Sequence, residues 1–103
     1  MLKIEDLRML CSDETIVITK HTINRLEERG INYSDVTQAI LTGEIIEQYP
    51  DPYPSCLILA VSNSDKPIHV VTGLGDDKLW IISTYFPTLD KWESDYRTRK
   101  AVE

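Results

Sequence analysis

The first part of the chain carries apolar residues at helical spacing. Residues 4–11 have this spacing and predict a short first helix. A second helix is expected to begin after Thr19, a residue type that caps helices, and to end at Gly30. A third is expected from Ser34 to Gly43, because the apolar residues between them lie on one side of a helix.

After residue 43 the pattern changes to short β-branched and aromatic runs separated by Pro, Gly and Asp. Such runs are typical of strands joined by tight turns, and the three prolines after the first run predict a rigid exposed loop. The sequence therefore predicts four strands, over residues 45–49, 56–62, 68–72 and 79–85. Residues 15–18 are also β-branched and predict either a brief strand or an extended segment.

A last helix is predicted over residues 89–99, where Leu89, Trp92 and Tyr96 lie along one side. Helices followed by a meander of strands define an α+β domain, with N-terminal helices packed on an antiparallel β-sheet and a C-terminal helix. A chain of 103 residues favours a single domain over residues 1–103.

Composition bounds the class of protein. The sequence has neither an apolar run of the ~20 residues that span a bilayer nor the apolar stretch of a signal peptide. We therefore expect a cytoplasmic protein with no membrane partner. The formal net charge of −6 argues against broad, salt-driven nucleic-acid binding but leaves room for a small cationic pocket.

The two cysteines and two histidines do not have the spacing of a metal site. We interpret Cys11 and Cys56 as small, reduced, partly buried residues. No metal and no cofactor are expected.

The second predicted helix carries His21, Arg25 and Arg29 four residues apart, so at about 100° per residue they form one stripe opposite the apolar side. The two arginines repel each other by about 0.2–0.5 kcal/mol at this spacing. An anion bound between them would remove the repulsion. The alternative is an ordinary solvated face on which Glu28 pairs with Arg25.

The second histidine lies in a predicted strand. If both neighbouring turns have even lengths, His69 lies opposite Thr84 and Ala60 on one sheet face, with Tyr85 on the other face unless a bulge intervenes. His69 would then line a pocket, or be a half-buried histidine bonded to Thr84 or backbone. Tyr85 is a candidate for the same site unless it packs in the core. The opposite face is the predicted main core and carries Leu57, Leu59, Val61, Val70 and Ile81.

Four motifs in chain order carry a resemblance to a known family. They are His21-x-x-x-Arg25-x-x-x-Arg29-Gly30-Ile31, Gly43-Glu44-Ile45-Ile46 with Tyr49-Pro50, Pro67-Ile68-His69-Val70-Val71, and Ile82-Ser83-Thr84-Tyr85-x-Pro87. Over residues 16–99 the chain resembles the small bacterial domain-of-unknown-function family 4258. That family is similar to the RelE-like and barnase-like ribonuclease fold of many toxin proteins. RelE-type toxins are usually strongly basic, whereas this chain is acidic.

The resemblance implies a metal-independent ribonuclease that acts on RNA by acid/base chemistry. It assigns catalysis to His21, His69 and Tyr85, and phosphate or substrate binding to Arg25, Arg29 and Thr84. The alternative is a non-catalytic protein-binding module on the same fold, holding an antitoxin-like partner through the sheet edge or through aromatic residues near the C-terminus. An enzyme needs both histidines in one cleft, whereas a binding module needs a contiguous exposed apolar patch.

Overall fold

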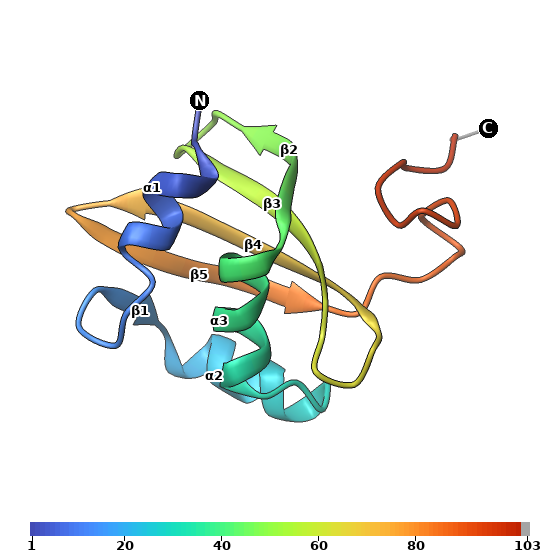
Figure 1. The fold of residues 1–103 in the computed structure, drawn as a ribbon, viewed down its shortest axis with the longest axis horizontal. Helices are drawn as coiled ribbons and strands as arrows, with labels where there is room; N and C mark the ends of the chain where they lie inside the picture. The colour runs from blue at the N-terminus through green and yellow to red at the C-terminus, as the bar shows by residue number, and fades with distance from the viewer. Residues whose placement is uncertain (102–103) are drawn as a thin grey trace.

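The structure, a computed structural model, describes residues 1–101. It contains helices α1 (Ile4–Met9), α2 (Lys20–Glu28) and α3 (Tyr33–Thr42), and strands β1 (Ile16–Ile18), β2 (Glu44–Tyr49), β3 (Ser55–Val61), β4 (Pro67–Gly75) and β5 (Lys78–Tyr85). The strands form one sheet in the order β1-β5-β4-β3-β2 (Figure 1). The α+β class is confirmed. The sheet is mixed rather than purely antiparallel, because β1 pairs with β5 in parallel.

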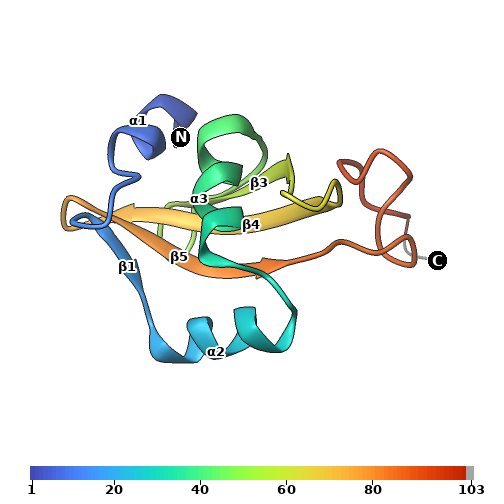
Figure 2. The ribbon, with the colours of Figure 1, turned by 60° about the horizontal axis from the view of Figure 1, so that its bottom comes forward.

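Helices α1 and α3 cover one face of the sheet, which we call the helix face (Figure 2). The core lies between them and the strands, and its buried members include Leu7, Val36, Ile40, Ile58, Val70 and Ile81. No helix within residues 1–101 is long and apolar enough to cross a membrane.

The ends of α2 and α3 follow from local sequence. The Thr19 side chain accepts a hydrogen bond from the backbone N–H of Thr22, and Gly30 has the positive φ of +68° that ends a helix. The predicted limits of α2 are therefore confirmed. Helix α3 begins two residues earlier than a cap at Ser34 would place it, because Asn32 and Asp35 form the capping box.

The turn between β4 and β5 is centred between Asp76 and Asp77, as predicted. Both residues have positive φ, and Gly75 pairs with Lys78. A β-bulge between Val71 and Thr72 then shifts the pairing. In consequence His69 lies opposite Tyr85, and the predicted pairing with Thr84 is wrong.

The hairpin between β3 and β4 has an odd-length loop. The Ser62 N–H donates to the Lys66 carbonyl at 2.7 Å, and Asp65 adopts a positive φ of 61°. His69 therefore pairs with Leu59 instead of the predicted Ala60. This shift reverses the faces of β3. The β3 residues in the main core are Cys56, Ile58 and Ala60, not Leu57, Leu59 and Val61.

The other side of the sheet, which we call the second face, carries a group of titratable side chains. Cross-strand partners share a face, so the observed registers bring together residues from four strands there. They are Glu47, Tyr49, Leu57, Leu59, His69 and Tyr85.

The C-terminal segment, residues 88–100, does not form the predicted helix over residues 89–99. Instead, the Asp95 carboxylate accepts hydrogen bonds from the backbone N–H groups of Arg97 and Thr98, and Trp92 forms a bridge with Arg99. Asp in this role stabilises a turn at the expense of a helix. The segment packs at the end of the sheet where β5 ends (Figures 1 and 2).

Gly43 lies at the junction between α3 and β2, where the surrounding atoms leave no room for a side chain. A Cβ at this position would lie 2.6 Å from the Ala39 carbonyl oxygen and 2.7 Å from Ile58 Cγ2. Gly43→Ala is therefore expected to lower the free energy of unfolding by about 1–3 kcal/mol, as overpacking does. Chemical denaturation measures this loss. Gly75→Ala is the control, because its Cβ meets only Trp80 at 3.4 Å, and an equal loss there would contradict the prediction.

Candidate functional site

The side chain of His69 is fully buried near the start of β4 and is bonded at both ring nitrogens. Its Nε2 lies 2.7 Å from the backbone carbonyl oxygen of Tyr96, and its Nδ1 lies 3.2 Å from the hydroxyl of Tyr85. A carbonyl can only accept, so Nε2 carries the proton. Nδ1 then accepts from the Tyr85 hydroxyl. These two contacts fix one neutral tautomer of the imidazole.

Aromatic rings enclose the same imidazole. Trp92 packs edge-on against it with ring centroids 4.5 Å apart, and Tyr85 does so at 5.3 Å. Burial lowers the pKa of His69, and the Arg99 charge lowers it further. The hydrogen bond to Tyr96 and the Glu47 charge only partly oppose these effects. His69 is therefore neutral in the folded protein at neutral pH.

A carboxylate on β2 lies beside this imidazole network. Glu47 accepts two hydrogen bonds from the Arg99 guanidinium, at 2.9 and 3.0 Å, and is also hydrogen-bonded by the Tyr49 hydroxyl. The bond from Arg99 is the main reason that the pKa of Glu47 is lowered. Burial and the bond to Glu47 raise the pKa of Tyr49 to about 12. We call Glu47, Tyr49, His69 and Tyr85 the His69 cluster.

The predicted stripe on α2 lies outside the His69 cluster. His21 is exposed on the first turn of α2, and Arg25 pairs with Glu28 at 3.5 Å on an exposed surface. Arg29 donates to the backbone carbonyl of Thr84 at 2.7 Å, beyond the part of the β5 edge that β1 pairs. Within residues 1–101, no carboxylate clasps Arg29.

Thr84 and Tyr85 point to opposite faces of the sheet. Thr84 pairs with Val70, a core residue, and so faces the helices, where its hydroxyl has no hydrogen-bond partner within residues 1–101. Burial raises the pKa of Tyr85, and the charges of Arg99 and, more weakly, Arg29 oppose this effect. The structure thus joins His69 to Tyr85 and separates the Thr84 side chain from both.

Sequence reasoning missed Glu47, Tyr49 and Arg99. The first two are separated by two positions on β2, and that alternation places them on one face of the sheet. This signal was available in the sequence. The contact of Arg99 with Glu47 was not, because it depends on the irregular path of the C-terminal segment.

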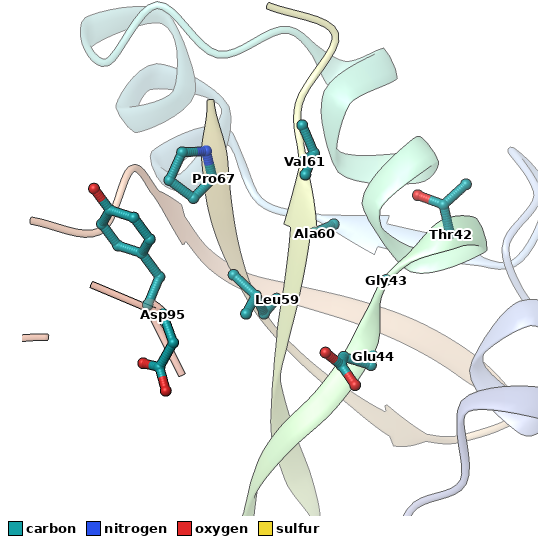
Figure 3. Close-up of a pocket in the computed structure, with 9 residues that line it drawn as sticks. Thr42, Gly43, Glu44, Leu59, Ala60, Val61, Pro67 and Asp95 are labelled. Atoms are coloured by element: carbon teal, nitrogen blue, oxygen red, sulfur yellow. The ribbon is translucent and has the colours of Figure 1, made fainter. Parts of the chain in front are cut away.

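Hollows formed by residues 1–101 lie beside the second face. A groove of about 520 Å³ separates the C-terminal segment, at Asp95 and Tyr96, from Leu59 and Pro67 on the sheet (Figure 3). A cavity of about 480 Å³ lies beside Tyr85 and is bordered by Lys91, Trp92 and Arg99. An apolar groove of about 500 Å³ is lined by Tyr53, Pro54, Trp80 and Ile82.

The fold and its contacts define a small α+β domain with helices on one sheet face and an acid/base cluster on the other. The chain belongs to the DUF4258 family, a domain of unknown function, whose sequence model matches residues 18–86. Searches of curated proteins and of solved structures found no match. The matched region contains all four residues of the His69 cluster and ends before the C-terminal segment. Within residues 1–101, no group of three or more His, Cys, Asp or Glu side chains could hold a metal ion.

The buried neutral state of His69 predicts a pH dependence of stability. Its native pKa lies below the ordinary 6.5, so the unfolded chain binds a proton first as the pH falls. The burial of neutral His69 therefore does not lower the free energy of unfolding above about pH 6.5. Below this pH the free energy of unfolding falls by up to about 1.4 kcal/mol per pH unit, until the pH reaches the native pKa of His69.

Denaturation across this pH range measures the slope. His69→Gln is expected to reduce it, whereas His21→Ala is expected to leave it unchanged, because His21 is exposed. A slope that His69→Gln leaves unchanged would assign the titration to another group.

Proposed function

We propose that this chain is a metal-independent ribonuclease of the RelE-like toxin type, with the His69 cluster as its acid/base site. One observation carries the proposal: a single sheet face gathers an imidazole, a carboxylate and two phenols within the region that defines the family. A cytoplasmic location, where RNA is available, belongs to the same proposal.

Cleavage of RNA without a metal needs a base for the ribose 2′-hydroxyl, an acid for the leaving 5′-oxygen and a cation for the phosphate. Glu47 is the proposed base. The 2′-oxygen then attacks phosphorus, and the imidazolium of His69 donates its Nε2 proton to the 5′-oxygen. A bound phosphate favours this imidazolium, because an adjacent anion raises the pKa of a histidine. The products are a 2′,3′-cyclic phosphate and a 5′-hydroxyl.

The other groups have supporting roles in this proposal. Tyr85 orients His69 through Nδ1, and Arg29, whose charge acts on Tyr85, supplies a cation for the phosphate. The catalytic role predicted for His21 and the phosphate-binding role predicted for Arg25 are untested. In this proposal both residues instead contact a further part of the RNA, because they form an exposed stripe on α2 outside the His69 cluster. Thr84 is proposed only as the backbone anchor of Arg29, because its side chain faces the helices.

RNA cleavage by the purified full chain tests the proposal. Glu47→Gln and His69→Gln are each expected to slow cleavage by about 10²–10⁴-fold, the usual contribution of one acid or base. The assay uses labelled RNA with protein in excess and identifies the cyclic phosphate. Circular dichroism verifies that each variant is folded.

His21→Ala is the matched control, because it removes the other imidazole of the chain from an exposed site. It is expected to change cleavage far less than His69→Gln. Equal cleavage by His69→Gln and the unchanged chain would contradict the proposed site.

The second candidate function is a non-catalytic module that binds an antitoxin-like partner protein. The apolar groove favours it, because Tyr53 is 73% exposed and Ile82 is 48% exposed beside Trp80. This function predicts that the full chain leaves RNA intact and that Trp80→Ala weakens binding of the partner. A contribution of Glu47 and His69 to cleavage would instead favour the ribonuclease.

A further inference from the structure

The C-terminal segment occupies the groups that the proposed chemistry requires. The Tyr96 carbonyl lies 2.7 Å from Nε2 of His69 and takes the hydrogen bond that this nitrogen would give to a substrate oxygen. The Trp92 side chain is only 3% exposed and packs edge-on against the same imidazole. Within residues 1–101, the imidazole of His69 is fully buried and has no surface in contact with solvent.

The same segment also binds the carboxylate of Glu47. The guanidinium of Arg99 donates two hydrogen bonds to Glu47 and lies 4.6 Å from the Trp92 ring. A second arginine of the segment, Arg97, pairs with Glu44 at the start of β2. A carboxylate held in this way by a guanidinium is a poor base for a ribose hydroxyl.

The attachment of the segment is slight compared with that of the sheet. Trp92 is its buried hydrophobic anchor, whereas Leu89 is half exposed and the side chains of Arg97 and Glu44 are about half exposed. Partly exposed ion pairs contribute little stability. The groove in Figure 3 already separates part of the segment from β3 and β4. Segments with few buried contacts open at low cost in free energy.

We propose that residues 88–100 close the His69 cluster and must move away before a substrate can bind. While the segment is closed, the Tyr96 carbonyl occupies the position of a substrate oxygen beside Nε2 of His69. In the same closed state, Arg99 neutralises the charge of Glu47. This regulatory role rests on the proposed function, whereas the closure itself can be measured without it. The family match ends at residue 86, so the closing element lies outside the matched region.

Modification of histidine by diethyl pyrocarbonate, resolved by mass spectrometry of peptides, tests the closure in the full chain. The chain has two histidines, and exposed His21 is an internal reference for the reagent. The double variant Arg97→Ala/Arg99→Ala is expected to raise the rate at His69, relative to His21, by about three- to tenfold, as the loss of two weak ion pairs predicts. Trp92→Ala is expected to raise it further.

Lys91→Ala/Lys100→Ala is the matched control. It removes the same charge from exposed positions of the same segment and is expected to leave the rate at His69 unchanged. Denaturation of each variant excludes global unfolding as the cause of modification. If neither Trp92→Ala nor the double arginine variant raises the rate at His69 above that of the lysine control, the closure is overturned.

RNA cleavage by the same proteins separates the two proposals. Faster modification of His69 together with faster cleavage supports both. Faster modification with RNA left intact supports the closure and overturns the ribonuclease. Cleavage that depends on His69 while the arginine and tryptophan variants leave its modification slow overturns the closure and supports the ribonuclease.

Discussion

The structure of the second face depends on the burial of one imidazole that is bonded at both nitrogens. Nδ1 of His69 accepts a hydrogen bond from the Tyr85 hydroxyl on the neighbouring strand. Nε2 donates a hydrogen bond to the Tyr96 carbonyl of the C-terminal segment. A buried polar ring without these partners would destabilise the fold, because an unsatisfied buried group costs about 1–3 kcal/mol. The bond to Tyr96 therefore ties the sheet to an irregular segment that has only one large buried side chain of its own, Trp92.

The sequence predicted the parts of the fold that local patterns determine. Thr19 and Gly30 marked α2, and the turn at Asp76 and Asp77 was placed correctly. The β-bulge at Ile82 in β5 and the odd-length loop that contains Asp65 were not predicted, since each inserts one residue without a strong signal. Because strand side chains alternate, the odd-length loop moved every residue of β3 to the opposite face. The bulge changed only the pairs from Val71 to His69, beyond the correctly predicted turn.

The candidate site was predicted in part for the same reason. His69 and Tyr85 were both selected, but only the bulge places them on one face. Glu47 could have been found from the alternation of β2. Arg99 could not, because Asp95 folds the segment into a turn where apolar spacing had favoured a helix. Side chains supplied by irregular segments have no period from which to predict them.

The proposed RNA site is compatible with an acidic chain. A net charge of −6 would act on encounter with RNA from a distance, whereas the proposed site depends on the few charges beside His69. In the closed form Arg99 is paired with Glu47, so the segment and the carboxylate neutralise each other. In the proposed opening, Arg99 leaves the carboxylate, and Glu47 is then free to act as the proposed base. One movement of residues 88–100 would thus change both the electrostatics of the cluster and the access to it.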